Sequence, residues 1–234
     1  DGQGEVGFAL TRPPGHHATI NRAMGFCLLN NIALASEYLL QEKGATRVAI
    51  VDLDLHHGNG TQDIFYNRED VLYLSTHQSP FYPGTGHVPE AGSGKGEGTT
   101  VNIPLPVGSG DGAFHEIMEK VILPMLERFQ PHMVLVSYGY DTHWRDPLGS
   151  LLLSADSYAW MIQQLQAYAQ EHCRGRLALI LEGGYDLKAG KACAQGIISA
   201  LTGRSWEDPL GLSPSPESDE WRELVRRVIE KWSL

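Results

Sequence analysis

Cysteine is scarce in this chain of 234 residues, which holds only three cysteines and no Cys-x-x-Cys pair. An odd number of widely spaced cysteines, here Cys27, Cys173 and Cys193, does not fit a disulfide framework. The spacing indicates reduced thiols that pack as small apolar residues, and reduced thiols are typical of the cytoplasm. We therefore expect a cytoplasmic protein.

Long apolar runs and basic runs are missing as well. No segment offers the ~18 consecutive apolar residues of a membrane span, and the first residues, DGQGEVG, lack the charged-then-apolar pattern of a signal peptide. Lys and Arg number 18 against 28 Asp and Glu, a net charge of -10 without any basic cluster that could follow a phosphate backbone. We expect no membrane and no direct nucleic-acid partner, and a neutral or cationic ligand instead.

The length and a hydrophobic content of 42% suffice for a full core, so we expect one domain over residues 1–234. Continuous β-branched runs predict buried strands, and apolar residues at helical spacing predict helices. The predicted strands are 47–53, 71–76, 132–139 and 177–184, with a weaker strand at 99–105. The predicted helices are 28–43, 111–129 with a kink at Pro124, 154–172, 186–202 and 221–232.

This alternation predicts an α/β fold, a parallel β-sheet flanked by helices on both faces. Asp111 and Ser154 are predicted N-caps, and a Gly-rich loop over 79–98 and a flexible joint over 213–220 are expected at the surface. In open parallel sheets, ligands bind beyond the carboxyl ends of the strands. That edge is where the site should lie.

Acidic and histidine residues gather just past three of these strand ends. The stretch VDLDLHHGNG follows the first strand, Asp141 follows the third in SYGYD, and Tyr185 closes LEGGY after the fourth. One such residue in a turn usually caps or braces a loop. Because such residues follow three separate strands, the pattern favours a functional site over a chance arrangement.

A divalent cation is the simplest ligand for this cluster. In an extended backbone Asp52, Asp54 and His56 would share one side, while the intervening leucines face the core. With Asp141 as the best-placed third ligand, three protein groups leave an open position, as in catalytic zinc sites. Two carboxylates make the zinc site formally neutral and so weaken the activation of bound water, which means that a nearby base is required. The same ligands also suit Fe²⁺, Co²⁺ or Mn²⁺.

A histidine pair in PPGHHA could supply that base. His16 and His17 lie on a Pro-Gly loop, and we do not expect both to point into a core. In the functional interpretation one of them takes a proton from the attacking water and gives it to the leaving amine, while Asp52 orients its neighbour. Two solvent-exposed loop histidines remain the alternative.

These motifs resemble a known family. PPGHHA, GFCLLNN, VDLDLHHGNGTQDIF, SPFYPGTG, GYDTHWRDPLG and LEGGYDL occur in the order found in zinc-dependent histone deacetylases and their bacterial relatives, the acetylpolyamine amidohydrolases and acetoin-utilisation proteins. They cover about residues 12–190, and Asn59 with the LEGGY form is similar to the class II branch. The resemblance implies an arginase–deacetylase fold and hydrolysis of an N-acetyl amide.

The resemblance also implies a role for each site residue. The zinc ligands would be Asp54, His56 and Asp141. The general base and acid would be His17, beside Asn59, with His16 as its electrostatic partner held by Asp52. Tyr185 would donate a hydrogen bond to the oxyanion. The walls of a narrow substrate tunnel would be Gly25, Phe26, Tyr82 and Gly183. A K⁺ ion would be held by Asp52, Asp54, the backbone at His56, and Ser75.

Three departures from the family pattern carry expectations of their own. Asn59 replaces an acid found in many class I members, so His17 should be less basic and uncharged in the resting enzyme. Tyr82 replaces a commoner Phe and adds a hydroxyl at the tunnel mouth. The segment that usually precedes the histidine pair, with an acidic rim residue that grips the substrate, has no match here. We expect the chain to lack the N-terminal part of the fold; the alternative is that the substrate is gripped in a different way.

Several functions stay open at this point. Within deacetylation, acetyl-lysine proteins compete with acetylpolyamines or other small acetylated amines as substrates. A ureohydrolase with two manganese ions would need extra aspartates where His57 and Asn59 stand, and a non-catalytic metal-binding module would not need Tyr185. The oligomeric state is open too, and the other histidines are expected to be surface or packing residues.

Overall fold

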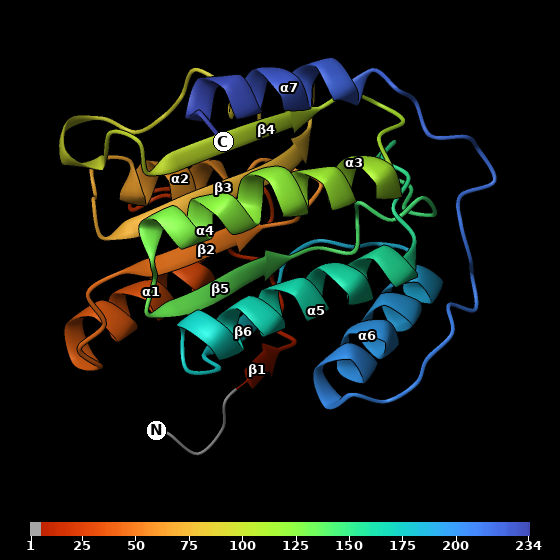
Figure 1. The fold of residues 1–234 in the computed structure, drawn as a ribbon, viewed down its shortest axis with the longest axis horizontal. Helices are drawn as coiled ribbons and strands as arrows, with labels where there is room; N and C mark the ends of the chain where they lie inside the picture. Colours follow the sequence, from red (N-terminus) through yellow and green to blue (C-terminus); the bar gives the residue numbers. More distant parts are fainter. Residues whose placement is uncertain (1–5) are drawn as a thin grey trace.

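A computed structural model describes residues 6–234, and its centre is one six-stranded sheet in which every pair of neighbours is parallel. Figure 1 shows this sheet beside its covering helices. The strands, in their order across the sheet, are β1 (Val6–Ala9), β6 (Leu177–Leu181), β5 (Met133–Tyr138), β2 (Val48–Asp52), β3 (Val71–Gln78) and β4 (Thr100–Leu105). The predicted parallel α/β sheet is confirmed, including its weaker strand, now β4.

Helices cover both faces of the sheet, as predicted. One face carries α1 (Asn31–Glu42) and α2 (Asn59–Phe65). The other face carries α3 (Asp111–Ile117), the π-helical turn η2 (Met118–Ile122), α4 (Leu123–Phe129), α5 (Ala155–His172), α6 (Leu187–Thr202) and α7 (Trp221–Trp232). Because side chains alternate along a strand, Val48 and Ile50 of β2 pack toward α1 while Ala49 and Val51 pack toward the helices of the opposite face.

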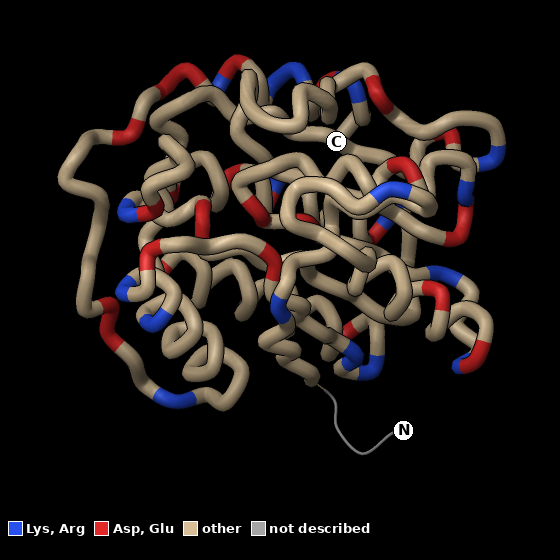
Figure 2. Tube along the Cα trace, turned by 180° about the vertical axis from the view of Figure 1, so that it is seen from behind, with Lys and Arg blue, Asp and Glu red and all other residues tan. Residues whose placement is uncertain are grey.

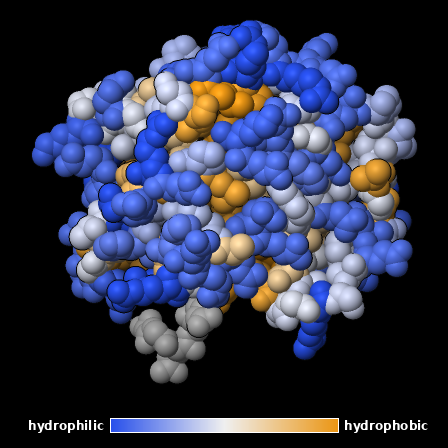
Figure 3. All heavy atoms as spheres, viewed as in Figure 1, coloured by the Kyte–Doolittle hydropathy of each residue, from blue (hydrophilic) through white to orange (hydrophobic). Residues whose placement is uncertain are grey.

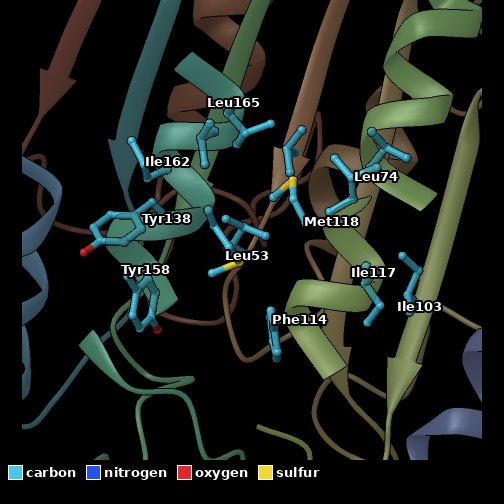
Figure 4. Close-up of a cluster of buried hydrophobic side chains, with 14 of the residues drawn as sticks. Leu53, Leu74, Ile103, Phe114, Ile117, Met118, Tyr138, Tyr158, Ile162 and Leu165 are labelled. Carbon is cyan, nitrogen blue, oxygen red and sulfur yellow. The ribbon is translucent and has the colours of Figure 1, made fainter. Parts of the chain in front are cut away.

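The larger core lies between the sheet and the second set of helices. Figure 4 shows Leu53 and Leu74 from the sheet side meeting Phe114 and Met118 from the α3–η2 segment and Ile162 from α5. All five side chains are buried. Full burial of one such side chain stabilises the fold by about 1.5–3 kcal/mol, so this layer fixes the sheet that carries the site.

Capping residues set the ends of the predicted helices. Asn30 accepts a hydrogen bond from the Ala33 amide at 3.0 Å, so α1 begins after it and not at residue 28. Gly44 has φ +68°, the left-handed conformation that ends α1 where predicted. Ser154 caps α5 as expected. Asp111 is instead the first residue of α3, and its carboxylate accepts hydrogen bonds from Ser154.

Two segments differ from the sequence prediction. The helix expected over 111–129 widens into the η2 π-turn just before Pro124, whose ring nitrogen cannot donate to the carbonyl four residues earlier. The joint expected to be flexible over 213–220 is anchored, because the Glu217 carboxylate accepts hydrogen bonds from three backbone amides at the start of α3. A carboxylate at a helix N-terminus is stabilising there.

The face of the molecule seen in Figure 3 is mainly polar, with apolar patches between hydrophilic neighbours. Figure 2 shows Lys and Arg positions scattered among Asp and Glu along the chain. Within residues 6–234 no helix combines the length and apolar character needed to cross a bilayer.

Candidate metal centre and catalytic pocket

The carboxyl ends of β2, β5 and β6 bring the predicted polar residues to one edge of the sheet. β2 ends at Asp52, so the next residues are not extended as expected. Instead the Asp52 carboxylate accepts the Asp54 amide at 3.2 Å, and the Asp54 carboxylate accepts the His56 amide at 2.8 Å. These two local turns, not strand alternation, direct Asp54 and His56 toward the same point.

Asp54, His56 and Asp141 converge as a possible metal-ligand set. One ligand atom from each lies within 4.8 Å of the others. His56 Nδ1 lies 3.1 Å from Asp54 Oδ1 and 3.2 Å from Asp141 Oδ2. Asp141 Oδ1 accepts the Leu55 amide at 3.1 Å, but Asp141 Oδ2 is buried and accepts no well-aligned hydrogen bond. A buried carboxylate oxygen left without a donor is what a cation site requires.

Two glycines give this set its space. A Cβ on Gly183 would lie 2.2 Å from Asp141 Oδ2, and a Cβ on Gly139 would lie 2.1 Å from Asp54 Oδ2. Any side chain at either position would push into the carboxylates. The Gly183 amide also donates to Asp54 Oδ2 at 2.9 Å, which fixes that carboxylate.

The charges of the set also fit a cation. Burial opposes a charge on His56, yet the adjacent carboxylates of Asp141 and Asp54 raise the pKa of His56 to about 10. Burial and the neighbouring Asp54 raise the pKa of Asp141 to about 7. Without a metal, a proton on His56 therefore offsets only one of the two carboxylate charges, and a divalent ion in place of that proton would offset both.

His16 and His17 are both buried, with exposed fractions of 2% and 4%, so the expectation that they could not both point inward was wrong. The reason is Glu182, whose Oε2 accepts the amides of Gly15 at 2.6 Å and His16 at 3.0 Å. Ser137 donates to its other oxygen at 2.8 Å. Glu182 is the second residue of the LEGGY motif and was given no role by sequence; it holds the histidine loop against the sheet.

The two histidines have opposite electrostatics. His16 Nδ1 donates to Asp52 Oδ2 at 3.1 Å, and although burial opposes it, the charges of Asp52, Asp54 and Glu182 raise the pKa of His16. Burial and the charge on His16 lower the pKa of His17 to about 3. His17 is thus neutral beside a charged partner.

Asn59 sets the tautomer of His17. Asn59 Nδ2 faces Met24 Sδ at 3.5 Å, so its Oδ1 is the atom 2.8 Å from His17 Nδ1 and accepts a hydrogen bond from it. The proton of the neutral ring is therefore on Nδ1, and Nε2 carries the lone pair. A histidine in this state can accept a proton through Nε2.

The residues expected to wall a tunnel surround one narrow cavity of about 50 Å³. Its lining comprises Pro14, His16, His17, Gly25, Phe26, Asp54, His56, Tyr82, Leu148, Gly183 and Tyr185. Phe26 and Tyr185 are edge to face with ring centroids 6.3 Å apart, and Tyr82 lies edge-on to His17 at 5.1 Å. Phe26 is 72% exposed, which places it at the mouth.

Two further positions shape this pocket. Gly25 has φ +55°, and a Cβ there would lie 2.2 Å from the His17 ring, so only glycine fits. Asp146 Oδ2 accepts the amide of Tyr185 at 2.7 Å, which holds the LEGGY loop in place. Leu148, from the DPLG turn that the sequence predicted to organise a loop near the site, completes the lining.

Ser75, expected to help hold K⁺, is buried and stands opposite Asp52 in the β2–β3 register. Its hydroxyl lies 2.9 Å from His77 Nδ1. His77 Nε2 in turn donates to the Gly86 carbonyl at 2.9 Å, so this histidine braces the loop over 79–98. Asp52 also accepts the Tyr73 hydroxyl at 3.0 Å.

Fold and site together define a class of protein, an α/β chain whose parallel sheet presents an Asp–His–Asp cluster and a buried histidine pair at its carboxyl edge. A family model described as histone deacetylase domain matches residues 1–201. The chain belongs to the histone deacetylase family.

Individual relatives agree with this assignment. The chain is 49% identical over 200 residues to a "Probable deacetylase" of Archaeoglobus fulgidus, covering 85% of this chain and 55% of that protein. It is 41% identical to "Histone deacetylase-like amidohydrolase" of Pseudomonas aeruginosa, covering 89% and 56%. Among solved structures, the HDA15 HD domain superposes with a TM-score of 0.85 at 41% identity, covering 97% of this chain and 61% of that one. The chain thus spans about half the length of these curated relatives.

Proposed function

We propose that this chain is the catalytic domain, over residues 1–234, of a zinc-dependent amidohydrolase that removes acetyl groups from acetylated lysine side chains. One observation carries the proposal: the buried Asp54, His56 and Asp141 cluster opens onto the same narrow cavity as His17 and Tyr185. Zinc bound there would polarise the acetyl carbonyl as a Lewis acid.

The side chains supply the remaining chemistry. His17 Nε2 accepts a proton from the attacking water, because Nδ1–H is held by Asn59, and returns that proton to the leaving amine. His16, fixed by Asp52, stands beside it with ring centroids 4.2 Å apart and favours the neutral resting form of His17. Burial and the charges of Asp141 and Asp54 raise the pKa of Tyr185, so its phenol stays protonated and donates to the oxyanion.

Substrate selection is assigned to the cavity mouth. Phe26 and Tyr82 would pack against the methylene stem of the acylated side chain, and Gly25 and Gly183 leave room beside it. Acetylpolyamines are the alternative substrates, since they present a similar stem. A K⁺ ion held by Asp52, Asp54, the His56 backbone and Ser75 would support the site from behind, and a cytoplasmic location fits the three unpaired, buried cysteines.

A ureohydrolase with two metals is disfavoured. The His57 side chain forms hydrogen bonds with Thr85 and Gln62, at 2.8 and 3.1 Å, and the Asn59 side chain forms one with His17. Neither position offers a carboxylate to a second ion. In the part of the chain that the structure describes, Asp54, His56 and Asp141 form the one candidate metal cluster.

Acetate release tests the proposal and ranks the substrates. The zinc-reconstituted protein is incubated with acetyl-lysine peptides and, in parallel, with acetylated polyamines. The proposal expects a higher kcat/KM on the peptides. A preference for the polyamines would select the alternative, and no acetate from either would contradict deacetylase activity.

The Asn59→Asp variant tests the state of His17 through the pH profile of kcat/KM. A carboxylate 2.8 Å from Nδ1 stabilises the imidazolium and raises the pKa of His17 from about 3. Protonated His17 cannot accept a proton, so the ascending limb should move to higher pH. The control is Asn67→Asp, which adds the same charge on the surface. An unshifted limb in Asn59→Asp would contradict this account of His17.

A further inference from the structure

A second cavity, of about 300 Å³, lies at the opposite end of the strands from the catalytic pocket. It is formed where α1 and α5 end and where β5 and β6 begin, and Figure 1 shows α5 running back toward the start of these strands. Its lining, called here the basic cavity, comprises Lys43, Gly44, His132, His172, Cys173, Arg174 and Arg176.

The basic cavity collects positive charge in an acidic protein. It has three permanent cations and two histidines, and no acidic residue among its lining, whereas the whole chain has a net charge of -10. Within residues 6–234 the guanidinium groups of Arg174 and Arg176 form no ion pair with a carboxylate. Other surface arginines, such as Arg68 and Arg226, are paired with acids.

The negative ends of the helix dipoles do not by themselves explain why so many cationic residues gather here. The carboxyl ends of α1 and α5 meet here, and each carries a partial charge of about -0.5, or about -1 together. Both ends are also closed by backbone hydrogen bonds: the Lys43 amide donates to Leu39 at 3.2 Å, and the Gly175 amide donates to Ala169 at 2.8 Å. The two guanidinium groups of Arg174 and Arg176 therefore already exceed what the helix ends require.

Backbone hydrogen bonds position parts of this lining. His132 Nδ1 accepts the Thr46 amide at 3.2 Å, so the proton of its neutral ring is on Nε2, which is left as a donor. The Arg176 carbonyl accepts the Val134 amide at 3.2 Å, which ties that residue to the start of β5. Donors from three separate chain segments thus surround one space.

We propose that the basic cavity binds a small molecule bearing phosphate. Guanidinium groups match phosphate oxygens through paired N–H donors, and a multiply charged anion makes use of several cations at once. The volume lies at the lower end of the roughly 300–1,000 Å³ typical of small-molecule sites. The ligand would bind apart from the catalytic pocket, because the basic cavity lies where the strands begin and the catalytic pocket lies where they end.

Pyrophosphate binding, measured by calorimetry at constant ionic strength on the metal-loaded protein, tests the proposal. We expect saturable binding with one site per chain. In the double variant Arg174→Gln, Arg176→Gln the dissociation constant should rise by roughly tenfold or more, because two charge-assisted contacts are lost. The matched control is Arg204→Gln, which removes the same charge from an exposed residue after α6 and should leave binding unchanged.

Acetate release serves as the measure of folding, since the cavity is remote from His17 and Tyr185. The double variant should retain wild-type kcat, and each single variant provides the same comparison if the double variant does not fold. The proposal is overturned if the wild type binds no pyrophosphate saturably, or if the arginine variants bind it as tightly as the Arg204→Gln control.

Discussion

The Tyr185→Phe variant is expected to keep its metal and to lose about 10²–10³ in kcat. The phenol lines the pocket next to the metal cluster, and burial with the charges of Asp141 and Asp54 keeps it protonated. A protonated hydroxyl can donate to negative charge that develops on the carbonyl oxygen, whereas Phe cannot. Because the hydroxyl is used mainly in the transition state, KM should change much less than kcat.

Metal content and acetate release are measured on the same preparation to separate this effect from loss of the ion. The control is Tyr38→Phe, which removes a hydroxyl from a tyrosine that is 52% exposed on α1. Wild-type kcat in Tyr185→Phe would refute the role assigned to the phenol. Loss of metal from that variant would show that the residue supports the ion instead.

The Asp141→Asn variant is expected to lose both zinc and activity. It removes one of two carboxylates from the cluster, and an amide oxygen is a much weaker ligand for zinc. In the wild type, zinc at 100 to 1,000 times its dissociation constant should raise the free energy of unfolding by about 3–4 kcal/mol. Urea denaturation of the variant should show none of this gain.

Without metal, Asp141→Asn should no longer be less stable than the wild type. Burial and the charge of Asp54 raise the pKa of Asp141 to about 7 from its ordinary 3.8, so its contribution to stability falls as pH rises from about 4 to 7. Asp141→Asn lacks this penalty and leaves Asp54 paired with protonated His56. With chelator at pH 8, the variant should therefore be at least as stable as the wild type. The control Asp63→Asn changes an exposed carboxylate on α2 and should keep the zinc response.

The sequence predicted the fold well where the local signal was long and regular. The β-branched runs became the central strands β2, β3, β5 and β6, because a parallel strand buried on both faces must be apolar throughout. α2 was not predicted, since seven residues that begin with Asn-Gly provide too few turns for helical periodicity. Its burial against β3 makes it helical, which is a tertiary effect.

The site was predictable in its residues but not in its geometry. Period-two alternation suggested that Asp54 and His56 converge, yet two side-chain-to-backbone hydrogen bonds produce that convergence. The burial of His16 and His17 depends on Glu182, more than 160 residues away in the chain. Contacts of this range leave no local pattern, so Pro-Gly flanks alone suggested an exposed loop.

Titration of the metal-free protein with zinc shows whether one bound ion makes the chain active. The chelator-treated chain receives increasing zinc, and acetate release from an acetyl-lysine peptide is measured at each step alongside bound metal. One cation held by Asp54, His56 and Asp141 predicts activity that rises linearly and levels off at one equivalent, with no response in Asp141→Asn. Activity that persists without metal, or that is restored equally in Asp141→Asn, would contradict the account.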